Sequence, residues 1–227
     1  MPQQPELHVL DDPAAAVGDL LAERARRGGS IVLTGGSTPG KAYERAAALA
    51  PDWSKVELWW GDERCVPPDD ERSNYRLAKE TLLDRLAEQP AEVHRIRGEL
   101  DPFEAAGEYD QALDGVTLDL LLLGLGPDGH VASLFPGTPQ LGVEDRRATS
   151  GPAGLEPWVD RVTLTLPTLR AAAEIVFLVT GEGKAEAVAR AFGAEISPQI
   201  PASLVLSTSS PVKVFLDPPA ASKLEAT

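Results

Sequence analysis

Short apolar runs that alternate with helix-like segments are the feature that most constrains the fold of this chain. The clearest run, residues 118–123, is almost unbroken leucine and leads directly into a glycine-rich loop. Short runs of this kind are typical of strands in a mostly parallel sheet that helices cover on both faces. We therefore predict an α/β fold with strands at residues 30–33, 56–60, 93–97, 118–123, 159–166, 174–180 and 212–216.

The patterns differ between segments. Residues 159–166 alternate, which predicts a strand exposed on one face, whereas residues 174–180 are apolar enough to be buried on both. Asp101 is expected to cap a helix that has Pro102 at its first position. Residues 136–157 are rich in proline and glycine, and we interpret them as a surface loop, with a flap over the site as the alternative. Helices are predicted at residues 41–49, 73–87, 102–113 and 182–192.

Length and charge narrow the function. The 227 residues suffice for a single α/β domain that covers residues 1–227. The 35 acidic and 21 basic residues give a formal net charge of −14. A nucleic acid is therefore not expected as a partner, because its phosphates require a basic surface. A small anionic substrate remains compatible if a few Arg or Lys side chains are gathered in a cleft.

The chain shows no sign of export. Cys65 is its only cysteine, so no intrachain disulfide can form, which fits a reducing compartment. The first residues lack the basic and apolar regions of a signal peptide, and the apolar runs are far shorter than a membrane span. We expect a cytoplasmic protein without membrane contact.

The loop at residues 124–137, GLGPDGHVASLFPG, contains the pattern Gly-x-Gly-x-x-Gly. In dinucleotide-binding proteins this pattern opens a long helix, but the prolines and glycine of residues 136–139 would end a helix here within about two turns. The loop is better interpreted through His130, which follows a strand end where α/β sheets bind ligands, with Asp128 near enough to orient the imidazole. No His, Cys or Asp cluster has metal-ligand spacing, so we predict no metal site.

A second loop, LTGGSTP, follows the predicted strand at residues 30–33. Its Gly35, Gly36, Ser37 and Thr38 precede a predicted helix, where amides and hydroxyls can surround a phosphate. The loop lacks the Walker A pattern. The alternative, which this loop taken alone favours, is an ordinary turn in which Ser37 or Thr38 caps the helix.

Basic residues lie near three of the predicted strand ends. Arg64 comes soon after the strand at residues 56–60, Arg161 begins an alternating strand, and Lys184 enters a helix. Each could contact an anion above the sheet, although each alone is more often a surface charge. Cys65, next to Arg64, is interpreted as a small packed side chain rather than a nucleophile.

Five segments carry a resemblance that covers most of the chain: LTGGSTP, GDERCVPPDDERSNYR, DLLLLGLGPDGHVASLFPG, RVTLTLPTLRAA and VTGEGKAEAV. In this order they closely resemble the 6-phosphogluconolactonases of the pentose phosphate pathway. The resemblance implies a Rossmann-like α/β fold shared with glucosamine-6-phosphate deaminases. It also implies hydrolysis of 6-phospho-D-glucono-1,5-lactone to 6-phospho-D-gluconate, with no metal or organic cofactor.

Two alternatives stay open. The deaminases share a phosphate loop and a DGH segment, but they typically continue as DGHIAFNEPG, and the glutamate of that segment is absent here. They also tend to have DEY where this chain has Asp62, Glu63 and Arg64. A sugar-phosphate-binding protein without catalysis on the same fold is the other alternative.

The expected mechanism follows from the resemblance. His130 is the general base that removes a proton from water as it attacks the lactone carbonyl, and Asp128 holds the imidazole. Loop amides or an arginine stabilise the oxyanion. The expected partner is a small sugar phosphate, and the expected state is a monomer or a weak homodimer. The residues expected to bind the phosphate are Gly35, Gly36, Ser37 and Thr38, with some of Arg64, Arg161 and Lys184.

Overall fold

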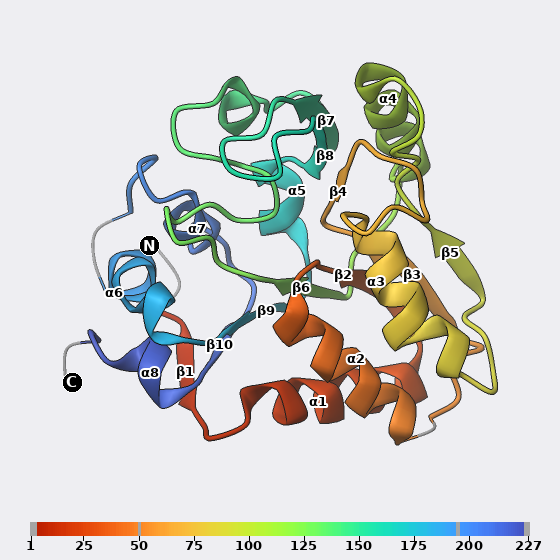
Figure 1. Ribbon diagram of the computed structural model, residues 1–227, viewed down its shortest axis with the longest axis horizontal. Coiled ribbons are helices and arrows are strands. Elements are labelled where there is room, and N and C mark those ends of the chain that lie inside the picture. Colours follow the sequence, from red (N-terminus) through yellow and green to blue (C-terminus); the bar gives the residue numbers. More distant parts are fainter. Residues whose placement is uncertain (1–3, 50, 194–195, 225–227) are drawn as a thin grey trace.

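The computed structural model describes residues 4–49, 51–193 and 196–224, and a parallel sheet runs through its centre (Figure 1). In this part of the chain seven strands form the sheet, and every pairing between them is parallel. The predicted α/β fold with a mostly parallel sheet is confirmed. In spatial order the strands are β1 (Glu6–Val9), β10 (Val212–Leu216), β9 (Ile175–Val179), β6 (Leu120–Leu123), β2 (Gly29–Leu33), β3 (Val56–Trp60) and β5 (Glu92–His94).

The order of the strands reverses between β2 and β6. From β2 the chain continues outward to β3 and β5, while β6 is followed on the other side by β9 and β10. Because the strands are parallel, their carboxyl ends lie at one edge of the sheet, and the loops after β2 and β6 leave that edge in opposite directions. A crevice opens at such a reversal, here between residues 34–36 and residues 124–130.

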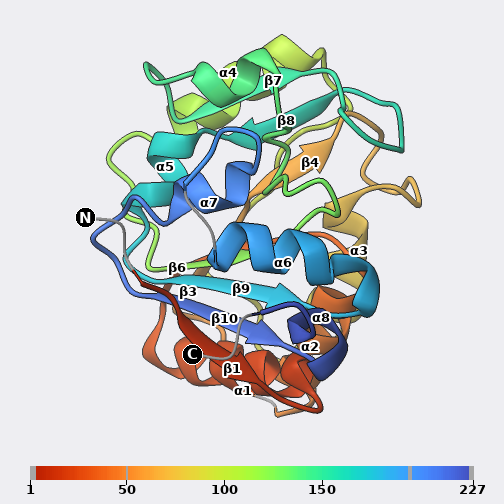
Figure 2. The same cartoon turned by 90° about the vertical axis from the view of Figure 1, so that its left-hand side faces the viewer.

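Helices cover both faces of the sheet. Figure 2 shows α1 (Pro13–Arg27) and α2 (Ser37–Ala48) below it and α6 (Ala185–Phe192) and α7 (Pro201–Val205) above it. All residues of β9 are buried, as its apolar sequence predicts. None of the helices in the described residues is long and apolar enough to cross a membrane. The other helices are α3 (Asn74–Thr81), α4 (Pro102–Ala112), α5 (Leu166–Ala171) and α8 (Pro218–Ala221).

A second, antiparallel sheet lies above the first in Figure 2. It consists of β4 (Asp62–Arg64), β8 (Arg161–Leu164) and β7 (Ala148–Gly151). The prediction that residues 159–166 are exposed on one face is wrong, because α4 packs on this sheet and every residue of β8 is buried. Residues 136–157 are mostly irregular and exposed or half-buried, as the surface-loop interpretation expects, but they also include a 3₁₀ turn (Pro139–Gly142) and β7, which the sequence did not predict.

The helix boundaries follow local chemistry. Asp101 caps α4 as predicted, and its side chain accepts hydrogen bonds from two backbone N–H groups of the first turn. Helix α2 begins at Ser37, earlier than predicted. Helix α3 ends at Thr81 rather than at residue 87, because the backbone of Leu82 leaves the helical region at φ −126° and ψ −71°. The side chain of Leu82 is then fully buried in the core.

Two buried tyrosines hold the carboxyl ends of β2 and β3. The Tyr43 hydroxyl donates to the carbonyl of Thr34 at 2.6 Å and accepts from its N–H at 2.9 Å. The Tyr109 hydroxyl makes the same pair of bonds with Trp60, at 2.9 and 2.8 Å. In each case a tyrosine hydroxyl, and not a neighbouring strand, supplies the hydrogen-bond partners of the N–H and carbonyl groups at the strand end. The loops that follow therefore do not have to continue the sheet.

Replacement of Tyr109 by phenylalanine tests this role. The change leaves the N–H and carbonyl of Trp60 buried without their partner, which lowers the free energy of unfolding by about 1–3 kcal/mol. Urea unfolding followed by circular dichroism measures it. Tyr75→Phe is the matched control, because the Tyr75 ring packs on the Trp60 ring in the same cluster. Equal stability of the wild type and Tyr109→Phe would contradict the role.

Candidate active site

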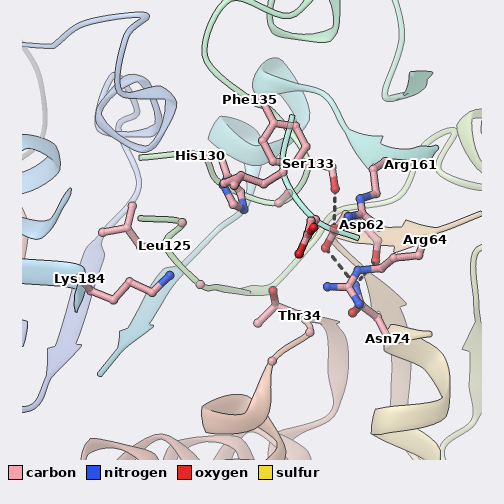
Figure 3. Close-up of a pocket in the computed structure, with 17 residues that line it drawn as sticks. Thr34, Asp62, Arg64, Asn74, Leu125, His130, Ser133, Phe135, Arg161 and Lys184 are labelled. Carbon is pink, nitrogen blue, oxygen red and sulfur yellow. Dashed lines mark hydrogen bonds between the residues drawn. The ribbon is translucent and has the colours of Figure 1, made fainter. Parts of the chain in front are cut away.

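A polar cavity of about 250 Å³ lies at the crevice between β2 and β6 (Figure 3). Its wall combines the loops after β2 and β6 with residues of the antiparallel sheet, of the start of α3 and of the turn before α6. Segments that are far apart in the sequence therefore meet in one site. The predicted site residues that line it are Gly35, Gly36, Arg64, His130, Arg161 and Lys184.

His130 lies in a tight turn directly after β6. The Gly126 N–H donates to the carbonyl of His130 at 2.9 Å, and the Gly129 N–H donates to the carbonyl of Gly126 at 3.0 Å. Gly129 has a φ of +86°, which favours glycine at this position. An isolated bridge between Val131 and Leu134 follows instead of a helix, so the glycine pattern does not open the helix that a dinucleotide site requires.

Asp128 contacts the imidazole of His130 directly. Its Oδ1 lies 2.6 Å from Nδ1 of the ring, and it also accepts a hydrogen bond from the His130 backbone N–H at 3.2 Å. Burial opposes ionisation of Asp128, but the hydrogen bond and the charge of His130 outweigh it, so the pKa of the carboxyl is lowered. An ionised Asp128 favours the ring tautomer that carries its proton on Nδ1, which leaves Nε2 as the basic nitrogen.

The imidazole is packed between a glycine and an aromatic ring. A Cβ at Gly126 would overlap Nδ1 and Cε1 of His130, so only glycine leaves room for the ring. On another side, the ring of Phe135 lies tilted against the imidazole, with 4.4 Å between centroids. Phe135 itself packs against Gly154, where a Cβ would lie 2.6 Å from the ring. These contacts limit the orientations that His130 can adopt.

Only two of the four residues predicted to bind phosphate at the start of α2 line the cavity. Gly35 and Gly36 line the cavity, but Ser37 and Thr38 do not. The alternative capping role for Ser37 or Thr38 is wrong, because Gly36 is the N-cap residue and no side chain caps this helix. Gly36 has a φ of +111°, and the Thr38 hydroxyl instead lies 2.7 Å from the hydroxyl of Thr180, at the end of β9.

Arg64 and Arg161 face each other across the pairing of β4 with β8. Arg161 is only 3% exposed, and its pKa is lowered by burial and then by the nearby charge of Arg64. Its Nη2 donates to the carbonyl of Pro157 at 2.9 Å. Among the described residues, Nε of Arg64 and Nη1 of Arg161 have no hydrogen-bond partner although both are buried. Two guanidinium groups with spare donors in one cavity are suited to bind an oxyanion.

Lys184 lies on the opposite side of His130 from the two arginines (Figure 3). It ends a short 3₁₀ turn (Glu182–Lys184) that precedes α6, within the segment predicted as one helix. Burial lowers the pKa of its ammonium group, and the charge of Asp128 acts in the opposite direction. The cavity therefore carries cationic groups on both sides of the imidazole.

Other residues of the site were not predicted. Asp62 is buried, and its carboxylate accepts hydrogen bonds from the Ser133 hydroxyl at 2.6 Å and from Nδ2 of Asn74 at 3.2 Å. Asp62, Asn74 and Ser133 all lie in the sequence segments that contain Arg64 or His130. Their nearness to these two residues in the chain was the only sequence signal that could have identified them. The stretch 136–157 also contributes. Further lining residues are Thr34, Asp62, Asn74, Ser133, Phe135, Leu155 and Glu156.

Thiol and metal chemistry find no support in this site. Cys65 does not line the cavity, and burial raises the pKa of its thiol to about 12, so it stays protonated at neutral pH. Within the described part of the chain, no group of three or more His, Cys, Asp or Glu side chains is arranged to bind a metal ion. The chemistry available to the site is that of an imidazole–carboxylate pair beside cationic groups that are suited to bind an anion.

Comparison with known proteins identifies relatives over most of the chain. The model of the family described as glucosamine-6-phosphate isomerases/6-phosphogluconolactonase matches residues 7–214. The 6-phosphogluconolactonase of Synechocystis is 40% identical over 189 residues, which span 79% of this chain and 77% of that protein. All of the predicted site residues lie inside the range that the family model matches.

Solved structures agree with this comparison. The 6-phosphogluconolactonase from Trypanosoma cruzi superposes with a TM-score of 0.84 and 26% sequence identity, covering 100% of this chain and 99% of that one. A monomeric glucosamine-6-phosphate deaminase gives a TM-score of 0.86 at 22% identity, over 96% of this chain and 99% of the other. At that identity the second likeness shows that the two proteins share a fold.

Anion binding by the arginine pair can be tested without a substrate. We expect inorganic phosphate to raise the Tm of the wild type, because a ligand that binds only the folded state stabilises it, by about 2.7 kcal/mol at a hundredfold excess over Kd. Arg161→Gln should lose most of this rise. Arg170→Gln is the matched control, since burial also lowers the pKa of Arg170 but it does not line the cavity. Equal phosphate dependence in all three proteins would refute the assignment.

Proposed function

The chain belongs to the glucosamine-6-phosphate isomerase/6-phosphogluconolactonase family, and we propose that it hydrolyses 6-phospho-D-glucono-1,5-lactone to 6-phospho-D-gluconate. The observation that carries this proposal is the His130–Asp128 pair, with Nδ1 and Oδ1 2.6 Å apart, in a cavity that also holds Arg64, Arg161 and Lys184. A cytoplasmic location and a monomeric or weakly dimeric state are proposed with it.

The cationic groups of the cavity bind the phosphate. Arg64 and Arg161 offer N–H groups that have no other partner among the described residues, and Lys184 adds an ammonium group. The N–H groups of Gly35 and Gly36, at the start of α2, lie where the helix dipole favours an anion. Since the substrate phosphate is doubly charged, several cations are needed to offset its desolvation.

His130 is the general base of the hydrolysis. Its Nε2 removes a proton from water while the water oxygen bonds to the lactone carbonyl carbon, and the carbonyl π electrons move onto oxygen to form a tetrahedral oxyanion. Cationic side chains or loop amides of the cavity stabilise that charge. When the oxyanion collapses, the ring C–O bond breaks, and protonated His130 donates its proton to the departing ring oxygen.

Asp128 acts through His130. Its carboxylate accepts a hydrogen bond from the Nδ1–H group, which keeps Nε2 free to act as base and stabilises the imidazolium that forms during the attack. No covalent nucleophile is required, because the lactone is an activated ester whose barrier is modest by the standard of enzyme-catalysed reactions. An oriented water and one positioned base therefore provide the chemistry.

Phe135 disfavours the deaminase alternative. In the deaminase segment DGHIAFNEPG a glutamate stands five residues after the histidine, and Phe135 occupies that position here. Its ring packs against His130 and cannot exchange a proton. Ring opening of an amino sugar phosphate would therefore lack this acid–base partner. The third alternative, sugar-phosphate binding without catalysis, leaves the His130–Asp128 pair without a role.

A direct assay distinguishes the three functions. The lactone is generated in situ by enzymatic oxidation of glucose 6-phosphate, and its loss is compared with the spontaneous rate. Acceleration supports the proposal. Ammonia release from glucosamine 6-phosphate would instead support the deaminase. A rise in Tm with 6-phosphogluconate and no turnover of either compound would support a binding protein.

The role of His130 predicts a large loss of turnover on substitution. His130→Ala should lower kcat by about 10²- to 10⁴-fold, the contribution typical of a general base. The matched control is His8→Ala, because His8 lies on the edge strand β1 outside the cavity and should keep its turnover. Initial rates at saturating lactone measure the effect. Near-normal kcat in His130→Ala would exclude it as the base.

Loss of Arg64 should act mainly on substrate binding. Arg64→Ala is expected to raise KM for the phosphorylated lactone by about 10- to 100-fold while kcat changes less, because one charge-assisted contact to the phosphate is lost. Rates with D-glucono-1,5-lactone, which has no phosphate, should change little. Arg76→Ala is the control, since Arg76 pairs with Glu80 on the surface of α3. An unchanged KM in Arg64→Ala would remove Arg64 from the binding site.

A further inference from the structure

Glu63 is a buried acidic residue that the proposed reaction does not use. It is 3% exposed and lies in β4 between Asp62 and Arg64, which both line the cavity. Because side chains alternate along a strand, Glu63 points away from the face that its two neighbours present. It is not among the lining residues, and no ion pair with a described residue neutralises it. Since no ion pair offsets the cost of burying this carboxylate, hydrogen bonds must do so.

The compensation comes from the beginning of α3. Oε1 of Glu63 accepts hydrogen bonds from the N–H groups of Arg64 and Asn74, both at 2.7 Å. Oε2 accepts from the Ser73 hydroxyl at 2.9 Å and from the Tyr75 N–H at 2.8 Å. Asn74 and Tyr75 begin α3, so the carboxylate also occupies the positive end of the helix dipole. One side chain thus joins β4 to the start of α3.

This junction sets the positions of cavity residues. Nη1 of Arg64 donates to the carbonyl of Arg72 at 2.5 Å, so the guanidinium is held by the segment that leads into α3. Nδ2 of Asn74 donates to the carbonyl of Asp62 at 2.9 Å, and the Asn74 side chain lies against Gly35. Each of these contacts depends on the position of residues 72–75 relative to β4.

We propose that Glu63 is a positioning residue for substrate binding, which acts by holding Arg64 in place through its hydrogen bonds to the start of α3. The proposal rests on the proposed lactonase function, since Arg64 is there the phosphate ligand. Glu63 itself touches no substrate.

Glu63→Gln keeps the shape of the side chain and replaces one acceptor oxygen by an NH₂ group. Whichever way the amide turns, at least one backbone N–H of Arg64, Asn74 or Tyr75 then faces a donor instead of an acceptor. The expected result is a KM for the phosphorylated lactone raised about tenfold with kcat nearly unchanged, as for the loss of one hydrogen bond to a charged group. Glu80→Gln, an exposed carboxylate on the same helix, is the control and should leave both constants unchanged.

A double-mutant cycle separates positioning from general stability. If Glu63 acts through Arg64, Glu63→Gln should have little further effect on KM in the Arg64→Ala background. An equal increase of KM in both backgrounds, or an unchanged KM with a lower Tm, would overturn the proposal. If the glutamine variant does not fold, Glu63→Asp, which keeps the charge but is shorter by one methylene, is measured in the same cycle.

Phosphate binding provides a readout that does not need turnover. The rise in Tm with inorganic phosphate should be smaller in Glu63→Gln than in the wild type and the same in Glu80→Gln. A wild type that binds phosphate but hydrolyses no lactone would refute the proposed function while this comparison still tests Glu63. An equal rise in wild type and Glu63→Gln would refute the positioning role whether or not the lactone is hydrolysed.

Discussion

The site depends on one constraint of the sheet, the reversal of strand order between β2 and β6. All strands of the sheet are parallel, so their following loops emerge at one edge, and only at the reversal do two adjacent loops diverge and leave space for a ligand. The loop after β2 supplies Gly35 and Gly36, and the loop after β6 supplies His130. The second sheet then closes the crevice from above and adds Arg64 and Arg161.

The electrostatics of the cavity oppose those of the whole protein. The chain has a formal net charge of −14, yet the cavity holds two guanidinium groups side by side, one of them only 3% exposed. Burial and mutual repulsion both make Arg161 harder to keep charged, which lowers its pKa. A bound phosphate would offset both effects, and this is the physical basis of the phosphate site that we propose.

The chemistry at the other end of the cavity depends on packing. Asp128 selects the tautomer of His130, while Gly126 and Phe135 restrict the plane of the ring. The same phenylalanine stands where the deaminase segment has a glutamate, so one side chain packs against the base that we propose and also takes the place of a second acid–base group. Proteins of one fold can catalyse different reactions when a single site residue differs, because function depends on the residues of the site and not on the fold.

The sequence alone determined the parallel sheet, most of its strands, the cap at Asp101 and the loops that hold His130 and Arg64, because apolar runs and caps are local patterns. The edge strand β1 and the alanine-rich α1 gave too weak a periodicity to be predicted. Only the tertiary structure decided that β8 is buried, since its alternating sequence cannot reveal that α4 covers it. The pairing of Arg64 with Arg161 was likewise settled by strand register, and the three donors to Glu63 from residues 73–75 by the packing of α3 on β4, because these contacts join residues that are not neighbours in the chain.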